Sequence, residues 1–282
     1  MWIAPPLLDD IIDRALSEDL AGGDITTVAT VDESARAVAT AVARAPLCVC
    51  GGEVFFQVFR RIEPSVVIAC LVPEGISVER GAAIWTVSGS ARALLMAERV
   101  ALNLAQRLSG IATTTRAYLG ALPEGSLTRL TDTRKTTPGL RVLERYAVRV
   151  GGAHNHRDSL GSGVLIKDNH IIAAGGIEKA ITRARAHAPH TARIEVEVAS
   201  LAELDVALAC RADIIMLDNF SLPDMLTGVE RAKGKAILEA SGGITLETLA
   251  AVASTGVDCI SIGALTHSAK AADIALDLVL ST

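Results

Sequence analysis

The sequence has few aromatic residues and no long apolar run. Phenylalanine, tryptophan and tyrosine make up only 3% of the chain, so the basic and aromatic surface that stacks on nucleic acid is not expected. No apolar run approaches the roughly 18 residues that a membrane-spanning helix needs. Residues 1–6 also lack the basic start and apolar stretch of a signal peptide. These absences predict a cytoplasmic protein that binds neither membrane nor nucleic acid.

Cysteine is scarce and positive charge is in deficit. The five cysteines are odd in number and scattered, which is typical of reduced thiols in a cytoplasm. Cys48 and Cys50 lack the two-residue gap of a zinc knuckle, so no structural metal is expected there. With 27 basic and 32 acidic residues the formal net charge is −5, which argues against a general surface for polyanions. Any anion must therefore be bound by a local cluster of cations.

The first part of the chain reads as a small antiparallel-sheet domain that occupies residues 1–110. Residues 9–20 carry apolar side chains at helical spacing. Four strand-like segments follow, separated by proline and glycine. A long helix, residues 91–108, is then expected to end at Ser109-Gly110 and to link this domain to the next. The four expected strands are residues 37–43, 54–59, 66–71 and 83–87.

From residue 127 onward, short apolar strands alternate with helical segments. This alternation indicates a parallel sheet, and the number of units favours an α/β barrel over residues 111–267. Residues 268–282 are expected to form a C-terminal helix that packs back on the N-terminal domain. The barrel strands are expected at residues 127–130, 163–166, 193–198, 214–217, 236–238 and 259–262, and helices at 176–188, 201–209, 222–232 and 245–253.

Each expected barrel strand is followed at once by a polar cluster. The active sites of barrel enzymes lie at the carboxyl ends of the strands. Helix capping explains one or two such clusters, but it favours Ser, Thr and Asn over the Lys and Glu found here. The clusters therefore predict one site, made by residues 131–135, 167–170, 218–219 and 239–243 with Glu197 and Gly263.

The segment 132–141 is the most basic of these clusters. Arg134, Lys135 and Arg141 lie within eight residues, and Pro138-Gly139 forces a turn. Arginine binds carboxylates and phosphates in bidentate fashion, so the segment is interpreted as an anion clamp. On charge alone, a solvated charged loop is an equally good interpretation.

Two further segments offer cations. In residues 151–158, His154 and His156 lie two residues apart without a third ligand nearby, so with Arg157 we favour hydrogen-bond donors to an anion over a metal pair. Lys167 follows a buried strand, where a lysine serves either as a Schiff-base nucleophile or as a fixed cation. The sequence leaves these two uses of Lys167 open.

Carboxylates occupy the next two strands. Glu195 and Glu197 point to the same side of one strand, and buried carboxylates need a cation or a metal. Glu197 and Asp218 together suit Mg²⁺ that is also bound by substrate phosphate oxygens. An ion pair with Lys167 or Arg157 is the alternative, and both arrangements can occur in different liganded states.

Glycine-containing loops follow the last two strands, at Ser241-Gly242-Gly243 and Ser261-Ile262-Gly263-Ala264. Many barrels bind a phosphate with the loops after their last two strands, through backbone N–H groups and a short helix N-terminus. The two loops together predict a phosphate site.

Taken in order, these loops resemble the quinolinate phosphoribosyltransferase family, and the likeness covers almost the whole chain. One departure is Ala153, where a third glycine is common in that family. The matching segments are residues 132–141, 146–148, 151–152, 155–157, 165–170, 195–198, 217–220, 239–243 and 263–267, with residues 18–20, 23–26, 98–99, 103–104 and 108–110 upstream.

The resemblance implies an incomplete α/β barrel with an N-terminal α+β open-faced sandwich domain. It also implies a homodimer in which the N-terminal domain of one subunit covers the barrel mouth of the other; further assembly of dimers is left open. The reaction would join quinolinate to 5-phosphoribosyl 1-diphosphate with Mg²⁺. Its products would be nicotinate mononucleotide, diphosphate and CO₂, in NAD biosynthesis.

The resemblance further implies a cationic quinolinate pocket, because quinolinate is a dicarboxylate. Lys135, Glu197 and Asp218 would be catalytic: Lys135 near the diphosphate or the quinolinate carboxylates, and the two carboxylates at the ribose hydroxyls. Glu197 and Asp218 would also be the metal residues, with Mg²⁺ held mainly through the substrate diphosphate. The remaining substrate-binding residues would be Arg134, His156, Arg157 and Lys167 with Arg99 donated across the dimer interface, Thr133, and, at the 5-phosphate, Ser241, Gly242, Gly243, Ile262, Gly263 and Ala264.

Three other functions fit part of the pattern. A phosphoribosyltransferase of the molybdenum-operon group shares the Thr-Arg-Lys-Thr core, but it usually lacks the Asn-His-Arg and Lys-Asp-Asn-His segments present here. A Schiff-base aldolase would use Lys167 as its nucleophile and would be trapped by borohydride. A non-catalytic binding paralogue would usually have lost Lys135, Glu197 and Asp218.

Overall fold

The structure is a computed structural model that describes residues 3–281. The chain divides into two compact units, each described here by itself. The antiparallel unit comprises Met1–Arg116, Thr136–Gly152 and Ser268–Thr282, and the barrel unit comprises Ala117–Lys135 and Ala153–His267. None of the helices in the described part of the chain is long and apolar enough to cross a membrane.

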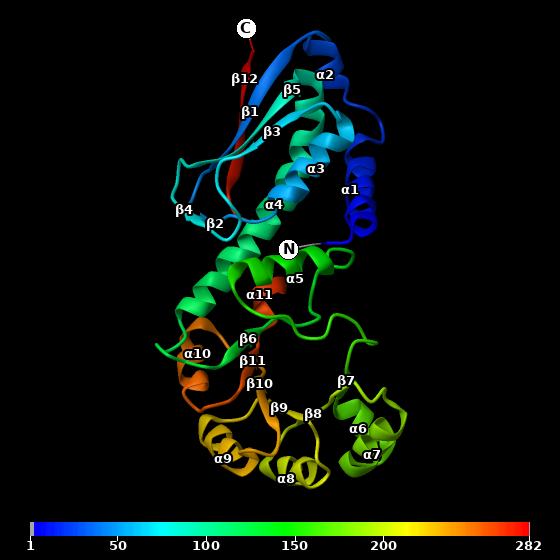
Figure 1. Ribbon diagram of the computed structural model, residues 1–282, viewed down its shortest axis with the longest axis vertical. Coiled ribbons are helices and arrows are strands. Elements are labelled where there is room, and N and C mark those ends of the chain that lie inside the picture. The colour runs from blue at the N-terminus through cyan, green and yellow to red at the C-terminus, as the bar shows by residue number, and fades with distance from the viewer. Residues whose placement is uncertain (1–2, 282) are drawn as a thin grey trace. The chain divides into compact units, whose positions relative to one another are not determined.

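The antiparallel unit is built on a four-stranded sheet in the order β12-β1-β5-β3 (Figure 1). Every second residue of β1 is buried, as expected for a strand with one face on a core. Helix α3 packs on the sheet, since the rings of Phe55 and Trp85 lie 4.9 Å apart. The elements are α1 (Pro5–Leu20), α2 (Ile25–Thr30), β1 (Arg36–Ala43), β2 (Leu47–Cys48), α3 (Gly52–Ile62), β3 (Val67–Cys70), β4 (Ser77–Val78), β5 (Ala83–Ser90), α4 (Ala91–Gly120), α5 (Arg141–Gly151) and β12 (Ile274–Leu280).

Two secondary-structure predictions for residues 1–110 are wrong. Residues 54–59 belong to helix α3, because their buried side chains recur at helical spacing, as in Val54, Val58 and Phe59. Helix α4 continues past Gly110 to Gly120. Gly110 does not end the helix; a Cβ there would lie 1.9 Å from the carbonyl oxygen of Lys270, so glycine permits a close backbone approach.

The C-terminal segment forms a strand and not the expected helix. Residues Ile274–Leu280 form β12, which pairs antiparallel with β1. The larger apolar side chains Ile274, Leu276 and Leu278 alternate with smaller or polar ones, which is the period of a strand. This strand places the last described residues in the antiparallel unit.

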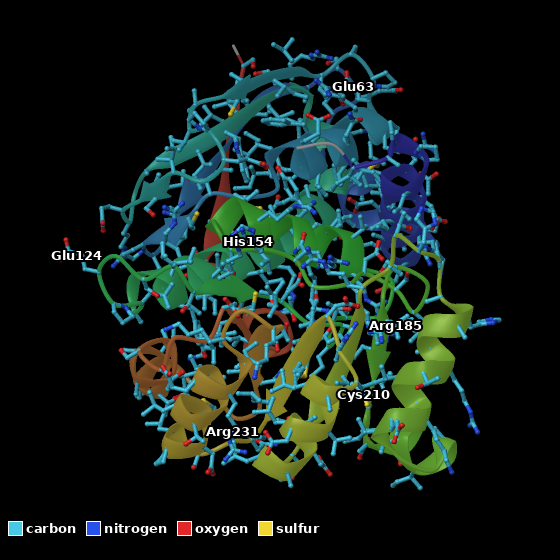
Figure 2. The ribbon with its side chains drawn as sticks, turned by 60° about the horizontal axis from the view of Figure 1, so that its bottom comes forward. Glu63, Glu124, His154, Arg185, Cys210 and Arg231 are labelled. Carbon is cyan, nitrogen blue, oxygen red and sulfur yellow. The ribbon has the colours of Figure 1, made fainter. Side chains whose placement is uncertain are left out.

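The barrel unit contains six parallel strands in the order β6-β11-β10-β9-β8-β7. Among the described residues, a parallel bridge from Thr131 to His154 is the one further pairing at the β6 edge. Strands β6 and β7 end the sheet and do not pair with each other, so the barrel is incomplete and the predicted fold class is confirmed. Arg185 on α7 donates to the carbonyl of Cys210 at 3.0 Å, which ties two outer helices together (Figure 2). The elements are β6 (Arg129–Thr131), β7 (Val164–Ile166), α6 (Asp168–Ala174), α7 (Ile177–His187), β8 (Ile194–Val198), α8 (Leu201–Ala209), β9 (Ile214–Asp218), α9 (Leu222–Ala232), β10 (Ile237–Ser241), α10 (Leu246–Ala253), β11 (Cys259–Ser261) and α11 (Ala264–His267).

Candidate active site

Strand register aligns polar residues at the carboxyl edge of the parallel sheet. The last paired residues of β7 and β8 immediately precede Lys167 and Glu197. On the next strands Asp218 pairs with Ser241. The side chains of Lys167 and Glu197 form an ion pair, so the cation predicted as one alternative partner of Glu197 is present.

A cavity of about 600 Å³ opens at this edge and collects most of the predicted site residues. Both cations and carboxylates line it, which suits an anionic substrate and a developing positive charge. The predicted residues that line it are Thr133, Arg134, Lys135, His156, Arg157, Lys167, Glu197, Asp218, Ser241, Gly242 and Gly243.

The rest of the predicted set lies elsewhere. Ile262 is buried, and its N–H donates to the carbonyl of Thr131 at 3.0 Å, so it is not free to bind phosphate. Gly263 and Ala264 do not line the cavity. Arg99 is exposed on α4, in the antiparallel unit.

Two residues that line the cavity, Leu165 and Met216, were not predicted to belong to the site. Asn219 and Ser261 also line it; both lie in predicted polar loops, but neither was given a role of its own. The hydroxyl of Ser261 is buried and has no hydrogen-bond partner among the described residues, so it can serve a ligand. Its place at the end of β11 agrees with the strand predicted at residues 259–262, but the sequence does not show the direction of its side chain.

Asp132 fixes the loop that carries His156. Its carboxylate is fully buried, and it accepts hydrogen bonds from the Asn155 side chain at 2.5 Å and the His156 backbone N–H at 2.8 Å. Lys135 is held in a similar way, since its carbonyl accepts from the hydroxyl of Thr266 at 2.8 Å. These hydrogen bonds hold the segment of Lys135 and the segment of His156 and Arg157 in place, so that their cations line one cavity.

Replacing Asp132 with Asn is expected to lower the free energy of unfolding by about 1–3 kcal/mol, because one buried donor loses its acceptor. Thermal unfolding of the unliganded protein measures this. Asp205→Asn is the control, since it removes only an exposed ion pair with Arg231 and should cost roughly 0–1 kcal/mol. Equal stability of the two variants would contradict the anchoring role.

The cationic part of the cavity is crowded with positive charge. Burial lowers the pKa of Arg157, and the nearby charge of Arg134 lowers it further. Arg157 is oriented by one hydrogen bond, from its Nη1 to the carbonyl of Gly163 at 3.0 Å. The two guanidinium groups repel each other, so the binding of an anion with two negative groups is favoured in this cavity.

Beneath the site lies a second cavity of about 560 Å³, which shares His156 and Arg157 with it. Here Nε2 of His156 lies 3.4 Å from a carboxylate oxygen of Glu195 and 3.5 Å from one of Glu239. Burial alone would lower the pKa of His156, but hydrogen bonds and charges from the two carboxylates raise it to about 10. Burial also raises the pKa of Glu195.

Comparison with known proteins gives the same assignment along the whole chain. The model of the quinolinate phosphoribosyl transferase N-terminal domain matches residues 24–109, and that of the C-terminal domain matches residues 111–277. The chain belongs to the quinolinate phosphoribosyltransferase family. The resemblance inferred from the polar loops is thereby confirmed.

Relatives in this family match over nearly their full length. The chain is 45% identical to nicotinate-nucleotide pyrophosphorylase [carboxylating] of Mycobacterium leprae, over 95% of this chain and 96% of the relative. It is 38% identical to the human protein of that name, over 99% and 94%. The crystal structure of NadC from Streptococcus pyogenes superposes with a TM-score of 0.96 at 40% identity and covers 100% of both chains. A quinolinate phosphoribosyltransferase fold therefore carries the cavity described above.

Proposed function

We propose that this chain transfers the phosphoribosyl group of 5-phosphoribosyl 1-diphosphate to quinolinate and releases CO₂, as an enzyme of NAD biosynthesis. The ring nitrogen of quinolinate forms a bond to the anomeric carbon, and the bond from that carbon to diphosphate breaks. The carboxylate beside the quaternised nitrogen then leaves as CO₂, and a proton takes its place. The product is nicotinate mononucleotide.

The observation that carries this proposal is that one cavity brings cations and carboxylates together at the carboxyl ends of the parallel strands. Its cations include Arg134, Arg157 and Lys167. Its carboxylates are Glu197 and Asp218, which lie on adjacent strands. A pyridine dicarboxylate fits the cations, and a ribose ring with partial positive charge fits the carboxylates. His156 lines the same cavity, and the exposed Lys135 would lie near the diphosphate or the quinolinate carboxylates.

Glu197 and Asp218 also suit Mg²⁺. Glu197 pairs with Met216 across the two strands, and Asp218 follows Met216 by two residues, so both carboxylates share one face of the sheet. Oxygen donors of this kind, completed by diphosphate oxygens, match the preference of Mg²⁺. When bound, Mg²⁺ would neutralise charge on the leaving diphosphate. Glu197 also forms an ion pair with Lys167.

The loop Ser241-Gly242-Gly243 would bind the 5-phosphate through its backbone N–H groups. Gly242 has φ +97°, and a Cβ there would lie 2.2 Å from Oδ1 of Asn219. Only glycine fits both the backbone conformation and the contact with Asn219.

Gly242→Ala should therefore raise KM for 5-phosphoribosyl 1-diphosphate by about tenfold or more, because the loop must shift away from Asn219. Steady-state kinetics on the folded variant measure this. Gly161→Ala is the control, since the nearest atom to a Cβ there is 4.0 Å away. An unchanged KM in the Gly242 variant would argue against a phosphate at this loop.

Arg99 would complete the quinolinate pocket from the other subunit of a homodimer. It is exposed on α4 and available for such a contact. A cytoplasmic location follows from the substrates of NAD biosynthesis and from the scattered cysteines.

Ligand-induced stabilisation tests the proposed substrate directly. Quinolinate at a hundredfold excess over its Kd should raise Tm by about 5 °C, whereas nicotinate, with one carboxylate fewer, should raise it far less. Equal stabilisation by both would contradict a dicarboxylate pocket. Borohydride trapping of a carbonyl substrate on Lys167 would instead support an aldolase.

A further inference from the structure

Asn219 has a backbone conformation that is unusual for a residue with a side chain. Its φ is +55°, in the left-handed region, and among the described residues Arg211 is the one other non-glycine residue with a positive φ. Asparagine tolerates this conformation better than most residues, but glycine adopts it without a steric cost. Asn219 directly follows β9 and lines the site cavity beside Asp218. Its side chain therefore calls for a functional account.

The side-chain amide of Asn219 holds the carboxylate of Asp218. Its Nδ2 donates to Oδ2 of Asp218 at 3.0 Å. An ionised carboxylate only accepts hydrogen bonds, so the amide nitrogen is the atom that must face it. The backbone N–H of Asn219 donates to the carbonyl of Ser241 at 2.9 Å. This second bond ties the turn after β9 to the end of β10.

The same amide packs against the loop Ser241-Gly242-Gly243. A Cβ on Gly242 would lie 2.2 Å from Oδ1 of Asn219 and 2.5 Å from its Cγ, so the amide fills the space beside this glycine. Asp218 and Ser241 are partners in the strand register, which places the carboxylate and the loop at neighbouring strand ends. One side chain therefore contacts both groups.

In the proposed function these two groups bind different parts of one substrate. Asp218 would lie at the ribose hydroxyls of 5-phosphoribosyl 1-diphosphate, and the loop would lie at its 5-phosphate. If their separation is fixed before the substrate arrives, binding does not have to order them. The cations of the proposed quinolinate pocket, Arg134, Arg157 and Lys167, precede β9 in the chain and lie in other loops.

We propose that Asn219 is a positioning residue that sets the distance between the Asp218 carboxylate and the 5-phosphate loop. This inference rests on the proposed placement of 5-phosphoribosyl 1-diphosphate in the site. Asn219 acts through Asp218 and Gly242, and not on the reacting atoms. Its loss should therefore weaken the binding of the phosphoribosyl substrate and leave quinolinate binding unchanged.

Two substitutions separate the amide from the backbone conformation. Asn219→Gly keeps the left-handed backbone and removes the amide, so KM for 5-phosphoribosyl 1-diphosphate should rise at least about fivefold. Asn219→Asp keeps the size of the side chain but sets a second carboxylate against Asp218, so the same KM should rise at least about tenfold. In both variants the rise in Tm caused by quinolinate should equal that of the wild type.

Arg211→Gly is the matched control. Arg211 has φ +56° and lies in the turn before β9, at the opposite end of the same strand. The substitution makes a similar backbone change away from the site, so KM for 5-phosphoribosyl 1-diphosphate should stay at the wild-type value. An equal rise of this KM in Arg211→Gly would assign the effect to backbone flexibility and overturn the inference.

Two phosphate compounds test the link between Asp218 and the loop without turnover. Ribose 5-phosphate reaches both groups, whereas inorganic phosphate reaches only the loop. In isothermal titration calorimetry, ribose 5-phosphate should bind the wild type at least about tenfold more tightly, and Asn219→Gly should reduce this ratio at least about threefold. Equal weakening of both compounds contradicts the linking role, and so does a wild type that does not bind ribose 5-phosphate.

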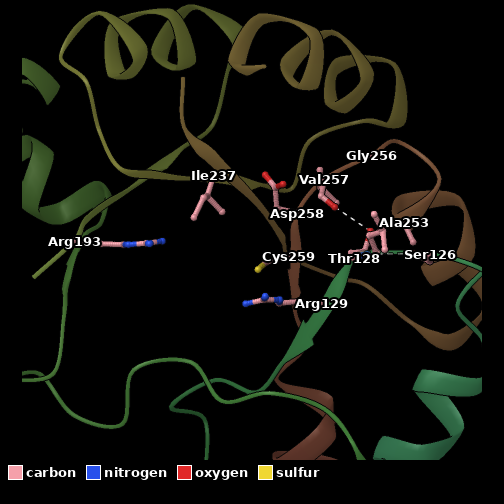
Figure 3. Close-up of a pocket in the computed structure, with 11 residues that line it drawn as sticks. Ser126, Thr128, Arg129, Arg193, Ile237, Ala253, Gly256, Val257, Asp258 and Cys259 are labelled. Atoms are coloured by element: carbon pink, nitrogen blue, oxygen red, sulfur yellow. Dashed lines mark hydrogen bonds between the residues drawn. The ribbon is translucent and has the colours of Figure 1, made fainter. Parts of the chain in front are cut away.

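A second cationic cavity requires a control in these titrations. At the amino end of the strands, Arg129 and Arg193 extend toward each other in a cavity of about 700 Å³ (Figure 3). The titrations are therefore repeated in the Arg193→Gln background, where Asn219→Gly should reduce the ratio by the same factor. Loss of the reduction there would place the phosphate in the wrong cavity and overturn the inference. Absence of turnover with quinolinate would instead overturn the proposed function, because these titrations contain no quinolinate.

Discussion

Lys167→Ala is expected to lower kcat/KM for quinolinate by about a hundredfold or more, because truncating one member of an interacting charge pair costs roughly 2–5 kcal/mol. The lysine sits at the end of β7 against Glu197. Its loss removes a cation from the quinolinate pocket and leaves Glu197 without its partner. Steady-state kinetics with saturating 5-phosphoribosyl 1-diphosphate isolate the effect on quinolinate.

Two controls separate this effect from general loss of charge. Lys179→Ala removes an exposed lysine from α7 in the same unit and should leave kcat/KM unchanged. Lys167→Arg keeps the charge and should retain part of the activity. A Lys167→Ala enzyme with near wild-type kcat/KM would rule out this lysine as a substrate-binding cation.

The second large effect concerns Arg99, which we propose is donated across a dimer interface. Arg99→Ala and Lys167→Ala should each be inactive alone. If each site takes Arg99 from one subunit and Lys167 from the other, a re-formed heterodimer regains one intact site of two. A random mixture should then recover about a quarter of wild-type activity.

Recovery must depend on subunit exchange. The mixture should be assayed before and after partial unfolding and refolding, with each variant refolded alone as the control. No recovery in heterodimers that are shown to have formed would mean that Arg99 and Lys167 do not complete each other's sites.

The barrel and its site could be predicted because their signals are local. Each parallel strand is a short apolar run that ends in a polar cluster, and the carboxyl ends of parallel strands meet at one edge. The sequence therefore predicts that Lys167, Glu197 and Asp218 share one site, and all three line the cavity. Family resemblance supplied the substrates, which no spacing of residues could give.

The predictions that are wrong concern residues whose structure depends on contacts with segments distant in the sequence. Gly110 is predicted to end a helix, but the helix continues, and the glycine allows the backbone of Lys270 to approach closely. Residues 274–280 form a strand because their backbone pairs with the edge of β1. Ile262 is predicted to bind phosphate through its N–H, but that N–H donates a hydrogen bond to the carbonyl of Thr131.

The link between His156 and Glu239 was also hidden in the sequence. Neither glutamate of the cavity beneath the site adjoins the histidine in the chain: Glu195 lies on β8 and Glu239 on β10, and the fold brings both to one cavity with His156. A pattern of alternating residues shows which side a carboxylate faces, but not what lies opposite.

The most direct test of the account is turnover of purified protein with quinolinate, 5-phosphoribosyl 1-diphosphate and Mg²⁺. We expect CO₂ and nicotinate mononucleotide in equal amounts, and little product when nicotinate replaces quinolinate. Equal turnover of nicotinate would contradict the claim that this barrel recognises a dicarboxylate.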